Sequence, residues 1–403
     1  MLNRRHFLAG AVTAALTTWQ RPTFAAAETD SRLVVVILRG ALDGLAAVPP
    51  VKDPSYASMR GALAFSATAG AQDTALPLDK LFGLNPALSG LHESYRAGEL
   101  LVVHAVASPY RERSHFDGQN VLENGTLAPN GSADGWLNRA LLELPPSPAR
   151  RELGLALGQN VPLVLRGRAA VASWAPSILP NASQDFLTRL ADLYSEDSAL
   201  SGRLSEAMNV SDMVESDAAG GDAMKPGRGD NLARLKQIVG TAGKLLAADS
   251  GPRVAVFDAT GWDTHANEGT SQGALAIRLR GLDGALTALK ISLGPVWNRT
   301  AVLVMTEFGR TVQINGSRGT DHGTATCALL LGGAVKGGRV LADWPGLRTA
   351  NLYEGRDLKP TTDLRQVVKG VLHEHLGVDP AALARNVFPE SQAIAPAEGL
   401  IRA

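Results

Sequence analysis

The chain is poor in cysteine, and its opposite charges balance. Cys327 is the one cysteine among 403 residues, so neither an internal disulfide nor a cysteine-ligated iron–sulfur cluster is available. The apolar surroundings of this cysteine, TATCALLL, predict a buried thiol rather than a nucleophile. Lys and Arg number 39, as do Asp and Glu, so no net field attracts nucleic acid, and no nucleic-acid partner is expected.

Two further absences concern redox cofactors and the membrane. No GxGxxG follows the first apolar run, so the fingerprint of a dinucleotide-binding fold is missing, which argues against a redox protein. Beyond the N-terminus no apolar run is long enough to cross a bilayer, so no stable membrane span is expected once a leader is removed. Apolar residues nevertheless make up 45% of the chain, which provides for a substantial core.

The N-terminus has the pattern of an export signal. In NRRHFLAGAVTAALTTW, the pair Arg4-Arg5 precedes an Ala-rich apolar run, and FAAAE offers a cleavage site after Ala27. The pattern resembles a twin-arginine signal over residues 1–27, with an N-terminal membrane anchor as the alternative. It implies the twin-arginine export machinery as a partner and a periplasmic or secreted location. This machinery moves folded proteins, so it permits a cofactor to be loaded before transport.

Residues 28–403 are interpreted as one domain of the α/β class with a mainly parallel sheet. Five apolar runs are typical of buried strands: RLVVVILRG, ELLVVHAVAS, VAVFDATG, TAVLVMTEFG and TCALLLGG. Helical spacing is seen in NPALSGLHESYRAGE, SQDFLTRLADLYSEDSALSGRLSEAM, GALAIRLRGLDGALTALKISLG and TTDLRQVVKGVLHEHLGV. A Gly-rich loop is predicted near 211–235. His373 and His375 are expected on the helix surface rather than at a metal.

Polar residues follow or precede the predicted strands at one edge of the sheet. In a parallel sheet the carboxyl ends of the strands are where functional groups gather. The residues at these ends are Asp43, Ser114, His115, Asp263, His265, Glu307, Arg310, Asp321 and His322.

Carboxylates that share one edge repel each other unless a cation neutralises them. Asp, Glu and His are ordinary metal ligands, so the sequence predicts one or two divalent ions of unknown identity. The expected ligands are Asp43, Asp263, His265, Glu307, Asp321 and His322. Such ions could hold an anionic ester and activate water, and Arg310 could bind a phosphate or sulfate oxygen.

Each of these residues also has a purely structural interpretation. Asp43 could cap the turn that follows it, and Glu307 could pair with Arg310 one helical turn away. Asp263 could form an Asx turn, and Ser114 could be a helix cap without any chemical role. The metal hypothesis depends on the repetition of these residue types at five strand ends.

Several motifs together resemble the bacterial family called domain of unknown function 1501. They are RGALDGLAAVPP, SHFDGQNVLENG, GWLNR, FDATGWDTHAN and VMTEFGRTVQING…GTDHGTATCALLLGG, in this order. The resemblance implies an alkaline phosphatase-like fold, with helices on both faces of the sheet and a two-metal site at the strand ends. By the same resemblance Asp43 matches a first-strand metal ligand, Asp263 and His265 a paired set, and His322 a late histidine. Glu307-Phe308 departs from the pattern, because an Asp-His pair is usual there.

The sequence therefore predicts an exported metal-dependent hydrolase of a phosphate or sulfate ester. Ser114 or water is the expected nucleophile, and His115 and Arg310 are expected to bind the charged group or assist proton transfer. The expected partner is a small anionic ester. The alternative is a non-catalytic binding or assembly protein that keeps the same fold.

Overall fold

The computed structural model describes residues 30–144, 153–158, 160–175, 231–249 and 251–402, with a few positions between 189 and 204. The predicted export signal lies outside these residues. The helix predicted over 183–208 lies largely outside them. Of the predicted Gly-rich loop, residues 231–235 alone are described, and they begin helix α9 (Asn231–Ala247).

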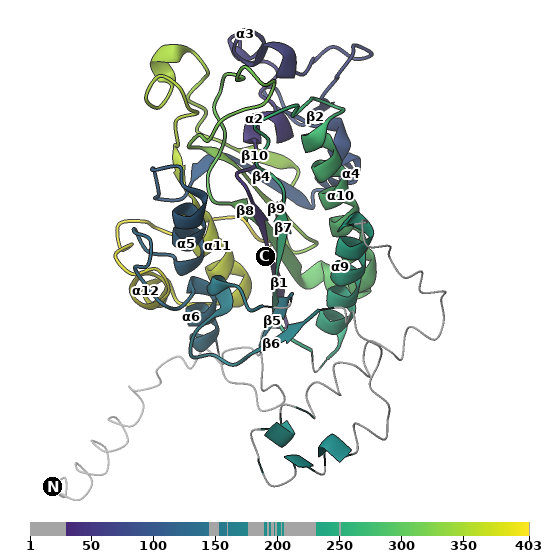
Figure 1. Cartoon of the computed structure of the whole chain (residues 1–403), viewed down its shortest axis with the longest axis vertical. Helices are drawn as coiled ribbons and strands as arrows, with labels where there is room; N and C mark the ends of the chain where they lie inside the picture. The colour runs from purple at the N-terminus through teal and green to yellow at the C-terminus, as the bar shows by residue number, and fades with distance from the viewer. Residues whose placement is uncertain are drawn as a thin grey trace, which may run out of the picture.

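One large sheet runs through the described part of the chain (Figure 1). Its strands are β1 (Arg32–Arg39), β4 (Leu100–Ala107), β5 (Gly154–Leu157), β6 (Val171–Trp174), β7 (Val254–Thr260), β8 (Thr300–Thr306), β9 (Thr326–Leu331), β10 (Arg339–Leu341) and β11 (Thr362–Asp363). Across the sheet the order is β10-β4-β9-β8-β1-β7-β5-β6, and β11 pairs with the end of β4. A separate small sheet joins β2 (Leu76–Pro77) and β3 (Gly83–Leu84).

Strand β9 is the exception to an otherwise parallel sheet. β1 is parallel to β7 and β8, and β5 is parallel to β7 and β6, whereas β9 is antiparallel to both β8 and β4. The prediction of an α/β fold with a mainly parallel sheet is confirmed. Because β9 is reversed, the residues before it lie at the same edge as the residues that follow β1, β4, β7 and β8.

Helices cover both faces of the sheet, with α4, α9 and α10 on one face and α5, α6 and α11 on the other (Figure 1). Their bounds are α4 (Ser89–Arg96), α5 (His115–Asn124), α6 (Trp136–Leu142), α10 (Ala274–Leu293) and α11 (Leu364–Leu376). Short helices α2 (Gly44–Ala47), α3 (Tyr56–Arg60) and α12 (Pro380–Ala382) lie in the connections. No helix of the described residues combines the length and apolarity needed to cross a membrane.

Strand β1 shows how the two layers are divided. Val34, Val36 and Leu38 pack in the core shared with α9 and α10, whereas Leu33 and Val35 pack in the core shared with α6 and α11. Successive side chains of a strand point to opposite faces, so a strand covered on both sides must be apolar throughout. This is why the continuous apolar runs identify the strands correctly.

Three expectations about single residues can now be compared with the structure. Cys327 is 1% exposed within β9, so the prediction of a buried thiol is confirmed. The prediction for His375 is wrong, because this residue of α11 is buried and its Nε2 atom lies 2.8 Å from the carbonyl oxygen of Arg32. His373 is exposed, as expected.

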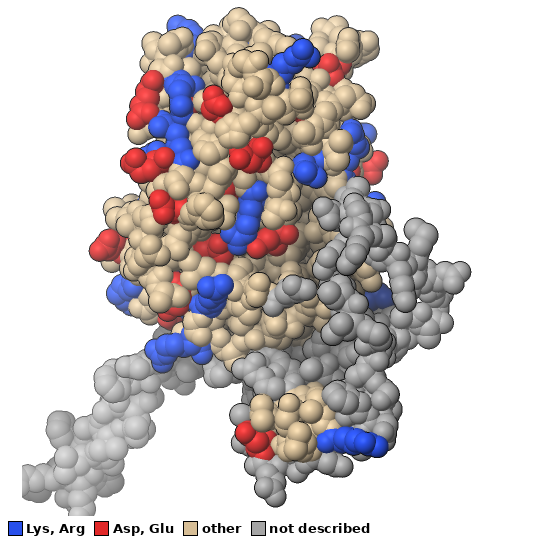
Figure 2. Space-filling view, in the orientation of Figure 1, with Lys and Arg blue, Asp and Glu red and all other residues tan. Residues whose placement is uncertain are grey.

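Figure 2 shows that Lys and Arg are interspersed with Asp and Glu over the described residues of this face, in keeping with the balanced composition.

Candidate metal centre

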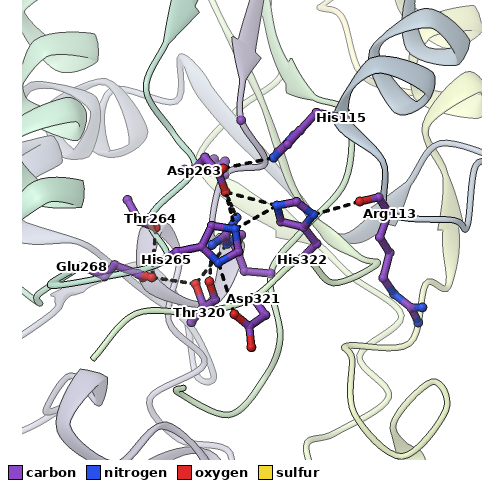
Figure 3. Close-up of polar contacts among 12 residues, drawn as sticks. Arg113, His115, Asp263, Thr264, His265, Glu268, Thr320, Asp321 and His322 are labelled. Atoms are coloured by element: carbon purple, nitrogen blue, oxygen red, sulfur yellow. Dashed lines mark hydrogen bonds and ion pairs between the residues drawn. The ribbon is translucent and has the colours of Figure 1, made fainter. Parts of the chain in front are cut away.

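Three histidines surround the carboxylate of Asp263 at the carboxyl edge of the sheet (Figure 3). His115 is the first residue of α5, His265 lies with Asp263 in the loop after β7, and His322 precedes β9. The Nε2 atom of His115 lies 3.4 Å from Asp263 Oδ2, and the Nε2 atoms of His265 and His322 lie 3.0 and 3.3 Å from Oδ1. Three ring nitrogens of the same type therefore converge on one carboxylate.

The opposite nitrogen of each histidine ring, Nδ1, contacts an oxygen acceptor. The pairs are His115 with Glu307 Oε1 at 2.8 Å, His265 with Asp321 Oδ1 at 3.2 Å, and His322 with the carbonyl oxygen of Arg113 at 2.9 Å. A carbonyl oxygen cannot donate, so Nδ1 of His322 carries the proton and Nε2 of the neutral ring keeps its lone pair. Metal-binding histidines have this arrangement of outer hydrogen bonds.

Glu307 holds the ring of His115 from inside the protein. Its side chain is 0% exposed, and Oε1 accepts hydrogen bonds from His115, from Gln119 Nε2 at 3.0 Å and from the backbone N–H of Gly40 at 2.8 Å. Burial alone would raise the pKa of Glu307, but the hydrogen bonds from His115 and Gln119 lower it. The same hydrogen bond to Glu307 raises the pKa of His115.

Arg310 lies beside Asp263 as its counter-ion. Nη1 of Arg310 donates to Asp263 Oδ1 at 2.5 Å, Nε donates to Thr320 Oγ1 at 3.1 Å, and Nη2 donates to the Thr320 carbonyl. Burial favours the neutral form of Asp263, yet the hydrogen bond from Arg310 lowers the pKa of this carboxyl group. Because the Arg310 side chain is 0% exposed and each of its nitrogens has a partner, its position differs from the predicted role of binding a phosphate or sulfate oxygen.

The residues present fit a divalent metal ion. The Nε2 atom of His115 is buried and has no hydrogen-bond partner among the described residues, although leaving such an atom unsatisfied costs about 1–3 kcal/mol. Ligand atoms of His115, Asp263 and His322 all lie within 4.8 Å of one another. Burial, and then the charge of His115, lower the pKa of His322, which favours the neutral ring that a metal requires.

Two glycines allow the loops of this centre to approach each other. Gly40 follows β1 with φ +121°, and a Cβ atom there would lie 2.7 Å from the backbone nitrogen of Asp263. A Cβ atom on Gly319 would lie 2.3 Å from the carbonyl carbon of His265. A side chain at either position would push the loops apart, and at Gly40 the positive φ also favours glycine.

Asp43 lies outside the histidine centre, contrary to the expectation that it is a metal ligand. Its Oδ1 atom accepts hydrogen bonds from the backbone N–H groups of Leu45 and Ala46 and so caps α2, which was the alternative interpretation. Its Oδ2 atom pairs with Arg60 Nη2 at 2.5 Å, and both side chains are buried. The cation that neutralises this carboxylate is therefore a guanidinium group of the chain itself.

Two other expected ligands, and the expected nucleophile, occupy indirect positions. Glu307 and Asp321 contact Nδ1 atoms of histidines, on the side of each ring that faces away from Asp263. Ser114 stands at the N-cap position of α5, where its side chain makes no capping hydrogen bond. No hydrogen bond joins its hydroxyl group to a histidine among the described residues. Of the predicted site residues, the structure brings His115, Asp263, His265 and His322 together.

Several residues that shape this centre are not predicted from the sequence. They are Arg60, Arg113, Gln119, Thr264, Glu268 and Thr320. Gln119 carries a readable signal, because it lies one helical turn after His115 and so shares its helix face. Arg113 contributes only a backbone oxygen and has φ +60°, and neither property can be read from residue type.

The chain belongs to the family described as "Protein of unknown function (DUF1501)", which matches residues 102–387. The resemblance noted from its motifs is therefore confirmed. No curated protein matches the chain.

Several solved structures are similar to the chain at low identity. The lipoteichoic acid synthase LtaP from Listeria monocytogenes is 9% identical with a TM-score of 0.40, over 90% of this chain and 76% of that one. Ps i-CgsB in complex with k-i-k-neocarrahexaose is 9% identical with a TM-score of 0.40, and the match covers 91% of this chain and 74% of that one. A TAB5 alkaline phosphatase mutant with Mg bound is 12% identical with a TM-score of 0.33, and the match covers 75% of this chain and 91% of that one.

Proposed function

We propose that this protein is an exported, metal-dependent hydrolase of a phosphate or sulfate ester. The observation that supports it most is the convergence of three histidine Nε2 atoms on Asp263. The Nδ1 atom of each ring contacts an oxygen acceptor, which orients the ring. The ester class comes from the resemblance of the motifs to the alkaline phosphatase-like superfamily. A small anionic ester is the proposed substrate.

His115, Asp263, His265 and His322 are the proposed ligands of one divalent ion. A set rich in imidazole nitrogen suits zinc, iron or a similar transition metal better than magnesium, calcium or manganese, which prefer oxygen. One ion rather than two is proposed, because Arg60 already neutralises Asp43. Glu307 and Asp321 would act as outer partners that fix the rings of His115 and His265.

Each residue has a defined task in this proposal. The bound ion would supply Lewis acidity toward the ester and toward water. Arg310 keeps Asp263 ionised, and Glu307 keeps Nε2 of His115 directed at the centre. Water is the proposed nucleophile, because no histidine among the described residues contacts the hydroxyl group of Ser114 and could remove its proton.

A non-catalytic binding or assembly protein remains the second candidate function. The observation that favours it is the position of Arg310, whose guanidinium group is buried and already donates a hydrogen bond within the protein from each of its nitrogens. In that case the metal centre would hold a ligand or stabilise the fold without turnover.

Purified mature protein without a histidine tag separates these functions. Elemental analysis reports bound metal, and aryl phosphate, phosphodiester and aryl sulfate substrates report turnover. We expect about one equivalent of metal and turnover of at least one ester class, both lost in Asp263→Ala and kept in Asp343→Ala, an exposed aspartate after β10. Metal without turnover supports the binding function, and absence of metal contradicts the proposed hydrolase.

Export is proposed from Arg4-Arg5 and the apolar run that follows them. The periplasm or the medium is the proposed location, and the twin-arginine machinery is the proposed partner. Cell fractionation tests this: replacing both arginines with lysine should retain the chain in the cytoplasm. Unchanged export of that variant would contradict a twin-arginine route.

A further inference from the structure

A buried glutamate joins the two loops that carry the proposed ligands. Oε2 of Glu268 accepts hydrogen bonds from Thr264 Oγ1 at 3.0 Å and from Thr320 Oγ1 at 2.7 Å (Figure 3). Thr264 stands between Asp263 and His265, and Thr320 stands two residues before His322. The Glu268 side chain is 0% exposed, so one interior carboxyl group contacts both loops directly behind their ligands.

The backbone pairs the same two loops. The N–H group of Thr320 donates to the carbonyl of Thr264 at 3.2 Å, and the N–H group of Glu268 donates to the carbonyl of Arg318 at 3.0 Å. The Thr320 hydroxyl group also accepts from Arg310 Nε at 3.1 Å. Through Thr320, Glu268 is thus connected to the guanidinium group that holds Asp263.

A carboxyl group in this place is costly and calls for an explanation. Glu268 Oε1 lies 3.7 Å from Arg60 Nη2, and the side chain of Glu268 also interacts with the buried carboxyl group of Asp43. Burial, and then the negative charge of Asp43, raise the pKa of Glu268 to about 8. A leucine would avoid the cost of burying a polar group but would accept no hydrogen bond from either threonine.

We propose that Glu268 is a positioning residue of the metal centre. By accepting hydrogen bonds from Thr264 and Thr320, it fixes the two loops, and with them the ligands Asp263, His265 and His322, at constant positions relative to one another. This inference rests on the proposed metal site for its purpose, whereas the loop pairing can be tested with or without metal. Outer partners of metal ligands typically change metal affinity by about 10–100-fold when removed.

The test compares Glu268→Gln, which keeps an acceptor oxygen of the same reach, with Glu268→Leu, which keeps volume alone. Thr320→Val and Thr264→Val each remove one donor with little change of shape. Thr300→Val is the matched control, because Thr300 is a buried threonine that donates to the Val296 carbonyl at 2.8 Å at the opposite end of β8. Metal affinity is measured by chelator competition, and amide exchange is followed in residues 261–268 and 315–322.

We expect Glu268→Leu to weaken metal affinity by about 10–100-fold and to speed exchange in both loops together. Glu268→Gln and the Thr300→Val control should keep wild-type affinity and exchange. Thr320→Val and Thr264→Val should each give a metal affinity and an exchange rate between those of the wild type and of Glu268→Leu. These two variants keep the test valid if the leucine variant does not fold.

Three outcomes would overturn the inference. They are wild-type affinity and exchange in folded Glu268→Leu, equal damage from glutamine and leucine, and no effect of either threonine variant. If the wild type binds no metal, the proposed hydrolase fails, and exchange alone decides the role of Glu268. Faster exchange in both loops of Glu268→Leu then supports the positioning role, and unchanged exchange contradicts it.

Discussion

The Nε2 atoms of His265 and His322 lie 3.0 Å apart beside the carboxylate of Asp263. Nδ1 of His322 donates to a carbonyl, and Nδ1 of His265 contacts the carboxylate of Asp321. If each ring carries its proton on Nδ1, two lone pairs and an anion face one another at close range. That arrangement is unfavourable unless a cation or an extra proton lies between them.

This geometry predicts a graded loss of metal binding. His265→Ala and His322→Ala remove proposed ligands and should each weaken metal affinity by more than about 100-fold, beyond the 10–100-fold expected for an outer partner. Asp321→Asn removes only the partner behind His265 and should fall within that smaller range. Chelator competition measures the affinities, with the exposed His373→Ala as control. Equal affinities in all four variants would refute the assignment of ligands.

The pair Asp43–Arg60 predicts a stability effect without a metal effect. Arg60→Leu leaves the 1% exposed carboxylate of Asp43 without its cation and should lower the free energy of unfolding by about 3–5 kcal/mol. The double variant with Asp43→Asn should recover part of this loss, because the uncompensated charge is gone. Urea unfolding measures both. Asp43→Asn alone should bind metal with wild-type affinity. Weaker metal binding by this variant would show that Asp43 is a metal ligand after all.

The sequence predicts five strands of the large sheet, β1, β4, β7, β8 and β9, and much of the site, whereas β5, β6, β10 and β11 are too short or too mixed in composition to stand out. Continuous apolar runs such as the one in β1 identify strands covered on both faces. The same runs carry no information about direction, so the reversal of β9 could not be read from them. That reversal brings His322 to the edge where β7 delivers Asp263.

The roles within the site were harder to predict than its location. Asp43 stands at a strand end as a ligand would, but its partner Arg60 comes from a different element and is revealed only by the fold. Glu307 and Asp321 were expected to bind metal directly. Which nitrogen of a histidine faces a carboxylate depends on tertiary packing, so sequence cannot tell a ligand from the residue that orients one.

The close approach at Gly40 predicts a local effect on the metal centre. Gly40→Ala would place Cβ 2.7 Å from the backbone nitrogen of Asp263 and would strain a backbone with φ +121°. Gly70→Ala is the control, because Gly70 also has positive φ, at +79°, but nothing lies within 4 Å of its Cβ position. Strain of about 1–3 kcal/mol is expected in both variants, and weaker metal binding only in the first. Equal metal affinity in both would show that the displaced loop does not carry a ligand.

Buried His104 predicts loss of stability in acid. Its Nε2 atom lies 3.0 Å from the Val48 carbonyl oxygen, and Nδ1 accepts from the Ala105 N–H at 2.8 Å, so the neutral ring satisfies both neighbours. Burial lowers the pKa of His104 to about 4, against roughly 6.5 for histidine in an unfolded chain. Above the unfolded value both states are neutral. Below it only the unfolded state takes up a proton, so stability falls with pH until the folded pKa is reached.

The expected contribution of His104 is about 1.4 kcal/mol per pH unit between roughly pH 6 and 4. Urea unfolding of the wild type and of His104→Gln across this range isolates it, because glutamine fills similar space without titrating. The wild type should lose stability faster than the variant as pH falls, and the exposed His373→Gln control should follow the wild type. Parallel curves for wild type and His104→Gln would mean that the folded protein protonates His104 as readily as the unfolded chain does.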